Sequence, residues 1–428
     1  MSNQNPTVKA SKSNFGAKGW FVIVFSFLCI LLQSSLINDS LNVVIGVFAK
    51  TRGWNINSLY AFSSICSAIS VLGAAFWGYV SNKTNIRFAW GISLAITAVA
   101  CFFWGTANNS VIYFICLAVS TVCGMAFCYI ANMNVISNWF PNKKGIAMGW
   151  VTIGFPLSAS ITTPLVTGLL GSGGLAKVYT FYAIVAAVFA VIAFVFVRDY
   201  PEQAGAYPDN DKTYSREEAE KSFAEGLEYM KVSPWKPGKL FKTVTVWKMA
   251  FSLGVLELLS LGIMTNFMPR FQQVGYADSE IIKMLAIAGI LACFGSYLCG
   301  QLDAHVGSKK AIMITQVIAI VAIILNIIPT RATQYASLPF LAMTLGGASN
   351  YLVSLTNTIW GRYDFPMAFK VLKPMVALVG ACGVAITGII GQSFSYVTAY
   401  TVLGVLAALA LVVMVITPDT YVGRKEDK

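Results

Sequence analysis

Charged residues are scarce in this sequence, and histidine is nearly absent. Only 11% of its 428 residues are charged, whereas a typical soluble domain has about 25%. With 57% hydrophobic residues, the composition excludes an ordinary soluble domain and predicts a chain that lies mostly in a lipid bilayer. The single histidine, His305, excludes histidine-based metal sites and a Ser-His-Asp triad. The nine cysteines have no metal-binding spacing and no ATP-binding loop is present, so we expect no metal, no cofactor and no enzymatic activity.

The hydrophobic residues gather in runs near the length of about 20 residues that a helix needs to cross a bilayer. Twelve such runs predict an all-α membrane protein with twelve transmembrane helices. In chain order they cover residues 20 to about 47, 58–80, 88–106, 111–138, 145–169, 178–197, 246–268, 281–302, 311–328, 335–360, 370–394 and 396–416. The one long hydrophilic insert, 198–243, divides them, so we expect two six-helix halves, 1–197 and 244–428.

Positive charge is concentrated on one side of the predicted helices. An even number of spans places both termini on the same side, which carries 24 of the 30 lysines and arginines. Because positive residues accumulate in cytoplasmic loops, we expect both termini and the insert to be cytoplasmic. The protein is then a multi-pass protein of the plasma or inner cell membrane. This distribution explains the net charge of +12 without a nucleic-acid partner.

Two motifs recur along the chain with nearly the same offset. The Phe-Pro pair at positions 140 and 141 returns 225 residues later, at 365 and 366. The loop that begins at Gly78 returns 222 residues later, at Gly300. Two coincident offsets indicate a duplicated unit, so we expect the halves to be related by pseudo-symmetry.

Polar side chains inside the predicted spans are candidates for a binding site, because polar groups are costly in a bilayer and tend to be functional there. They concentrate in the first, fourth, seventh and tenth spans. These spans are the first helices of the four three-helix repeats and are expected to line a central cavity. The candidate substrate-binding residues, with one lysine from the eleventh span, are Asn38, Asp39, Asn42, Tyr129, Asn132, Glu257, Asn350, Asn357 and Lys373.

Two of these candidates are acids that could couple transport to protons. Glu257 lies near the middle of the seventh span, where a carboxylate must be protonated, pair with a cation or face water. It is either a proton-coupling or substrate-contacting acid, or a structural hydrogen-bonding group between helices. Asp39 is a second proton-coupling candidate if the first span continues past it. If that span ends early, Asp39 is a solvated charge at the outer interface.

Charged residues near the predicted cytoplasmic ends of the spans are candidates for binding or gating. Lys373 lies about one turn into the eleventh span, where it either holds a carboxylate in the cavity or extends to the headgroups. Arg362 and Asp364, between the tenth and eleventh spans, are expected to pair and to help gate the inner side. The other candidate gating residues follow the second and eighth spans and are Gly78, Lys83, Arg87, Gly300, Asp303, Gly307, Lys309 and Lys310.

The loop after the eighth span resembles the signature of the major facilitator superfamily, which combines two glycines, an acid and basic residues. The matching residues are Gly300, Asp303, Gly307, Lys309 and Lys310. The copy after the second span has Asn82 in place of the acid and Asn85 in place of the second glycine. The resemblance covers the whole chain and implies twelve helices in two halves, without the usual charge-linked inner gate of the first half.

The segment from the fourth to the fifth span is similar to the oxalate/formate antiporter family and the related monocarboxylate transporters. The matching residues are Gly124, Tyr129, Trp139-Phe140-Pro141, Lys143-Lys144-Gly145, Ala147, Gly149 and Gly154-Phe155. In that family, oxalate transporters are expected to carry a basic residue in the eighth span and a lysine in the eleventh. Here the first position is Ser296, and Lys373 matches the second, with Lys370 as the alternative. One cation fits a monocarboxylate better than a dianion.

The resemblance therefore implies a secondary transporter that moves a small organic anion by alternating access, through proton symport or solute exchange. We expect the chain to act as a monomer. Glu257 and Asp39 also suit a zwitterionic substrate, or a proton-coupled exporter of lipophilic cations. A transporter-like solute sensor is a third alternative. The insert 198–243 and the tail 417–428 are short for the effector domain that a sensor would need.

Overall fold

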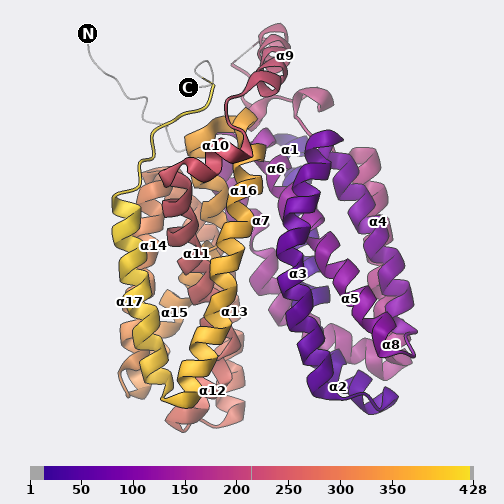
Figure 1. The fold of residues 1–428 in the computed structure, drawn as a ribbon, viewed down its shortest axis with the longest axis vertical. Helices are drawn as coiled ribbons and strands as arrows, with labels where there is room; N and C mark the ends of the chain where they lie inside the picture. The colour runs from indigo at the N-terminus through magenta and orange to yellow at the C-terminus, as the bar shows by residue number, and fades with distance from the viewer. Residues whose placement is uncertain (1–13, 214, 425–428) are drawn as a thin grey trace.

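The computed structural model describes residues 14–213 and 215–424, and it shows two helical bundles side by side (Figure 1). One bundle contains the helices between residues 16 and 196, and the other contains those between 244 and 415. No strand occurs among the described residues. The predicted all-α membrane fold is therefore confirmed.

The first half is built from six spans, two of which contain a π-helical turn. The first span consists of α1 (Gly16–Ser34), the π-helix η1 (Ser35–Asp39) and α2 (Leu41–Arg52). The second and third are α3 (Ile56–Lys83) and α4 (Ile86–Gly105). The fourth consists of α5 (Ser110–Gly124), the π-helix η2 (Met125–Ile130) and α6 (Ala131–Trp139). The fifth and sixth come from α7 (Lys144–Val151) and α8 (Gly154–Phe196).

The insert and the second half follow along the chain. The insert contains the short 3-10 turns η3 (Glu202–Ala204) and η4 (Pro208–Asn210), then α9 (Arg216–Val232) and α10 (Pro237–Lys242). The second half contains α11 (Val244–Thr265), α12 (Phe267–Val274), α13 (Asp278–Val306), α14 (Ser308–Ile327), α15 (Arg331–Gly347), α16 (Asn350–Ser393) and α17 (Tyr396–Val415).

Two of the long helical segments contain parts of two consecutive spans each, and glycines with non-helical backbone mark where one span ends and the next begins. Ten helical segments in the described part of the chain are long and apolar enough to cross a membrane. The segment 144–196 contains two spans, which meet at the non-helical Gly173 and Gly174. The tenth span consists of α15 and the first turns of α16, and the eleventh begins after Gly361, whose φ of 70° favours glycine. This division agrees with twelve spans, although most of the predicted loop at 361–369 is helical.

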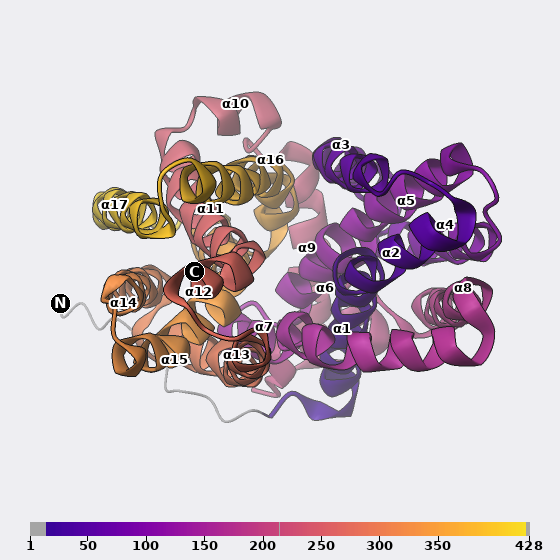
Figure 2. The same cartoon turned by 90° about the horizontal axis from the view of Figure 1, so that it is seen from below.

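The two halves contact each other toward one end of the bundles. We call this the linker end, because α1 begins there, α17 ends there and residues 198–243 lie there (top of Figure 1). Between the halves, α7 packs on α13 and α3 packs on α16, and a view along the bundles places α7 beside α13 (Figure 2). A Cβ added to Gly300 would lie 2.8 Å from the Cα of Gly149, so glycine allows this close approach. The bundles diverge toward the opposite end (Figure 1).

Candidate functional site

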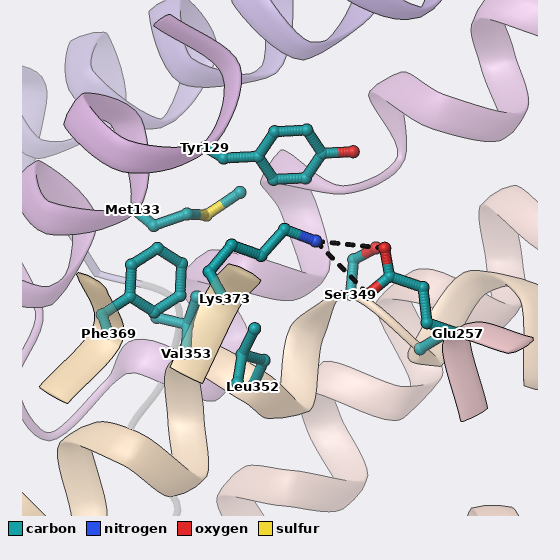
Figure 3. A pocket seen from close by; sticks show the side chains of 9 residues that line it. Tyr129, Met133, Glu257, Ser349, Leu352, Val353, Phe369 and Lys373 are labelled. Atoms are coloured by element: carbon teal, nitrogen blue, oxygen red, sulfur yellow. Dashed lines mark hydrogen bonds and ion pairs between the residues drawn. The ribbon is translucent and has the colours of Figure 1, made fainter. Parts of the chain in front are cut away.

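Lys373 and Glu257 form an ion pair inside the second half (Figure 3). Lys373, on α16, donates to both carboxylate oxygens of Glu257, on α11, at 3.0 and 3.3 Å. The Lys373 side chain is 6% exposed, so it does not extend to the headgroups, and that of Glu257 is 22% exposed. Each charge balances the other in a place where an unpaired charge would be costly.

A small cavity that both halves line contains this pair. The lining residues other than the pair are Tyr129, Met133, Ala348, Ser349, Leu352, Val353 and Phe369. The Lys373 ammonium lies 4.3 Å from the centroid of the Tyr129 ring, which makes a cation–π contact. The cavity volume is about 10 Å³, which is roughly the room for one water. A larger ligand must therefore displace these side chains or enter when the halves are arranged differently.

Glycines on α16 bring the two charged residues together. Gly380 lies against Glu257, and a Cβ added there would come within 2.9 Å of the Glu257 Cγ. Gly383 packs on the backbone of Leu258, the next residue of α11. Larger residues at these positions would push the two helices apart. The direct contact between Lys373 and Glu257 therefore depends on these two glycines.

Three of the predicted binding residues, Asn132, Asn350 and Asn357, are buried outside this cavity. Asn132 donates to a backbone carbonyl of α1 at 3.0 Å. Asn350 accepts a hydrogen bond from Thr152, and Asn357 donates to Ser137 at 2.9 Å, both in the first half. In this conformation, Asn350 and Asn357 join the two halves instead of lining the Lys373 cavity.

The predicted polar group of the first span also lies apart from Lys373. Asp39 is the last residue of η1 and accepts hydrogen bonds from Ser158 and Ser34 at 2.5 and 3.2 Å. Helix continues beyond it to residue 52, so Asp39 is not a solvated charge at the end of the span. The side chains of Asn38 and Asn42 are exposed and do not line the cavity.

The predicted pairing of Arg362 with Asp364 is wrong. Arg362 donates to both carboxylate oxygens of Glu202, in the insert, at 2.7 Å each. Asp364 accepts hydrogen bonds from Tyr229, at 2.8 Å, and from Ser233. Residues two positions apart on a helix do not face each other, so Arg362 and Asp364 contact different parts of the insert. Both residues attach the insert to the second half at the linker end.

The second copy of the signature motif lies where α13 meets α7. Gly300 packs on Gly149, and Asp303 accepts a hydrogen bond from Ser354 while lying against Gly145. The contact places an acidic side chain of the second half at the first turn of a helix of the first half, where negative charge is favoured. Of the other residues of the motif, Gly307 directly precedes α14, and Lys309 and Lys310 lie in its first turn.

The first copy of the motif has a different acid. Gly78 packs against the stem of Lys370, and Lys83 is exposed beside a tyrosine ring. The backbone N–H of Arg87 and that of the preceding residue donate to Asp199 at 2.7 and 2.8 Å. Burial raises the pKa of Asp199, while these two amides favour its charged form. Asp199, from the start of the insert, thus caps α4 where the signature acid is missing.

Sequence reasoning missed several residues at these contacts. Met133 lies one helical turn beyond Tyr129, and Phe369 lies one turn before Lys373, so the helical period could have found both. Glu202 is harder to find, because a hydrophilic insert contains many acids and no period singles one out. Its contact with Arg362 appears only once the halves and the insert are placed together.

A helical membrane protein with two similar halves, and with a buried charge pair next to the interface between them, has the architecture of a secondary transporter. The family model of the Major Facilitator Superfamily matches residues 20–364. The chain belongs to this superfamily.

Relatives and solved structures agree with this assignment. The chain is 22% identical to the oxalate:formate antiporter of Oxalobacter formigenes, over 95% of this chain and 93% of the relative. It is 23% identical to the uncharacterized transporter YhjX of Escherichia coli, over 70% of this chain and 72% of the relative. The structure of the human organic anion transporter MFSD10 matches with a TM-score of 0.70 at 15% identity, over 93% of this chain and all of that one. The structure of the proton:xylose symporter XylE matches with a TM-score of 0.72 at 14% identity, over 95% of this chain and 98% of that one.

Proposed function

We propose that this transporter moves a small organic anion, a monocarboxylate, across the cell membrane by alternating access. The observation that carries the proposal is the Lys373–Glu257 pair beside Tyr129, in a cavity that both halves line. A buried ammonium next to the interface between the halves is a ready partner for a carboxylate. The name of the Oxalobacter relative supports an organic anion as the substrate.

The number of cations at the site favours one carboxylate group in the substrate. Position 296, where a second cation would bind a dianion, is a serine whose hydroxyl lies 2.5 Å from that of Thr152. Lys370, the alternative cation, has its ammonium 5.4 Å from the ring of Tyr79 and does not line the cavity. Lys373 is therefore the cation that we assign to the substrate.

Glu257 determines how the anion is coupled to protons. A substrate carboxylate on Lys373 takes the place that Glu257 occupies in this structure. Glu257 then loses its cationic partner, and a buried carboxylate without a partner is costly. Taking up one proton removes this cost, so each monocarboxylate travels with one proton. If Glu257 is already neutral before the substrate binds, it cannot serve as the counter-charge of Lys373. Lys373 is then paired only while an anion is bound, which favours exchange of one anion for another.

The same pair supports a second candidate function, which is proton-coupled export of lipophilic cations. In this case an organic cation replaces Lys373 as the partner of Glu257. The Tyr129 ring already faces a cation in this structure, and aromatic faces bind organic cations well. The two functions differ in which member of the pair binds the substrate.

The orientation in the membrane belongs to the same proposal. The excess of lysine and arginine on one side of the spans favours a cytoplasmic location for the linker end, where α1 begins and α17 ends. Because the halves contact each other at the linker end, this conformation is closed toward the cytoplasm. It is the state in which we expect substrate to enter from outside.

Thermal stabilisation of the purified protein tests the proposed substrate class. A ligand that binds only the folded state raises the unfolding temperature by mass action. We expect a small monocarboxylate to stabilise the parent and Lys370→Met, but not Lys373→Met. Lys370→Met is the matched control, because it removes a lysine from the same helix outside the cavity. Stabilisation by organic cations alone, lost in Glu257→Gln, would establish the exporter function instead.

A further inference from the structure

A second polar cluster lies in the first half, where η1 meets α8. The Asp39 carboxylate accepts hydrogen bonds from Ser158 at 2.5 Å and from Ser34 at 3.2 Å. The Ser158 hydroxyl lies 3.2 Å from that of Thr162, one turn further along α8. Thr162 in turn donates to Ser35 at 2.8 Å. The oxygens of one carboxylate and three hydroxyl groups, those of Ser34, Ser158 and Thr162, are thereby brought close together.

The π-helical turn is what places Ser34 beside Asp39. Residues five positions apart on a regular α-helix point about 140° away from each other. The wider turn of η1 brings them to one face, because the backbone N–H of Ser40 donates to Ser35 instead of Leu36. The Ser40 hydroxyl then donates to the Leu36 carbonyl at 2.9 Å. Such π-helical turns are frequent at functional sites.

The charge of Asp39 has no partner of opposite sign among the described residues. Its hydrogen bonds come from hydroxyl groups, and none of the salt bridges among the described residues includes it. A charged carboxylate inside a membrane protein is costly, and a bound cation lowers this cost. Carboxylate and hydroxyl oxygens are ligands that hard metal cations prefer over nitrogen or sulfur. One negative charge balances a monovalent cation.

The hydroxyl groups can serve as ligands through their lone pairs, since Ser34 and Ser158 use their protons on Asp39 and Thr162 uses its proton on Ser35. Thr162 donates its proton to Ser35, and Ser35 forms a 2.7 Å hydrogen bond with Tyr182, so the Thr162 lone pairs are available to a cation. The oxygens lie 2.5 to 3.2 Å from their neighbours, so we expect the site to accept a small ion, sodium, more readily than the larger potassium. Asp39 is partly exposed, so an ion can reach it.

We propose that Asp39, Ser34, Ser158 and Thr162 form a binding site for one sodium ion. This site goes beyond the proposed function, since it lies in the other half and does not use Lys373. Binding of sodium balances the Asp39 charge and ties the end of α1 and η1, which supply Ser34 and Asp39, to α8, which supplies Ser158 and Thr162. The ion therefore stabilises the first half in the conformation described here.

The test is the unfolding temperature of the purified full-length protein at constant ionic strength, with choline replaced stepwise by sodium or potassium. We expect a saturable rise with sodium and a smaller rise with potassium at the same concentration. Asp39→Asn is expected to abolish the sodium response. Asp278→Asn is the matched control, because Asp278 is an exposed acid at the first residue of α13. This variant is expected to keep the sodium response of the parent. Ser158→Ala weakens the apparent sodium affinity about tenfold.

Three results would overturn the sodium site. The first is an equal response to sodium, potassium and choline, and the second is a full sodium response in Asp39→Asn. The third is an unfolding temperature that depends on pH through Asp39 but not on sodium, which would make the cluster a proton site. If Asp39→Asn does not fold, Ser158→Ala and Thr162→Val test the site instead. An unchanged sodium response in both variants would then overturn it. Because the probe is sodium alone, failure here leaves the result for Lys373 unaffected.

Discussion

Removing only one member of the Lys373–Glu257 pair should destabilise the protein more than removing both. Lys373→Met keeps the apolar stem but leaves Glu257 without its cation. Loss of one partner of a buried ion pair costs about 3–5 kcal/mol. The Glu257 side chain is 22% exposed, so water screens part of its charge, and we expect a cost near the lower limit, about 3 kcal/mol. In the double variant with Glu257→Gln no unpaired charge is left, and the cost falls below about 1 kcal/mol.

These free energies convert into measurable shifts of the unfolding temperature. For domains of about 150–250 residues, 1 kcal/mol shifts the midpoint by roughly 2–4 °C, and the shift decreases with chain length. For this longer chain, we expect Lys373→Met to unfold about 3–6 °C below the parent. The double variant should unfold close to the parent.

The measurement is a thermal unfolding series of the parent, both single variants and the double variant in one detergent. Lys231→Met is the control, because Lys231 pairs with Glu228 on the surface, with side chains 69% and 73% exposed. Exposed pairs contribute little to stability, so this variant should unfold with the parent. A double variant as unstable as Lys373→Met would refute the reasoning, since the pair would then not be electrostatically coupled.

Three further predictions concern the linker end. Gly300→Val places a side chain against Gly149, so we expect closure of the linker end to be blocked and uptake into proteoliposomes to be lost in a protein that still folds. Arg362→Gln and Glu202→Gln should each increase the reactivity of a cysteine introduced between the halves at the linker end, and the double variant should react no faster than either. Asp199→Ala removes the acceptor for two amides of α4, so calorimetry should show a loss of about 1–2 kcal/mol.

The fold could be predicted because the bilayer limits what a sequence can form. A span needs about 20 apolar residues and must satisfy its backbone hydrogen bonds internally, so the runs indicate the spans directly. The glycine breaks are less visible. A kink at the single non-helical residue Gly361 separates the tenth span from the eleventh, where the sequence predicts a longer loop.

The candidate site could be predicted only in part, residue by residue. Glu257 and Lys373 were identifiable because charges inside spans are rare. Their contact was not, because it joins residues 116 positions apart and depends on Gly380 and Gly383. Asn350 shows the opposite problem, since an asparagine that joins the halves has the same sequence pattern as one that binds a substrate.

The predicted pairing of Arg362 with Asp364 failed for a geometric reason. Opposite charges two positions apart can approach each other in an extended loop, but they diverge on a helix. The helix after Gly361 therefore directs the two side chains to separate partners in the insert. A prediction of this contact would have needed the position of Glu202, which follows from the packing of the insert on the second half.

The central claim is that a substrate carboxylate replaces Glu257 on Lys373 and that Glu257 then takes up a proton. Titration calorimetry of a stabilising monocarboxylate, repeated in buffers with different ionisation enthalpies, measures this proton uptake directly. We predict uptake of one proton per bound anion in the parent, binding without proton uptake in Glu257→Gln, and no binding in Lys373→Met. Equal proton uptake in the parent and in Glu257→Gln, or unchanged binding in Lys373→Met, would contradict the claim.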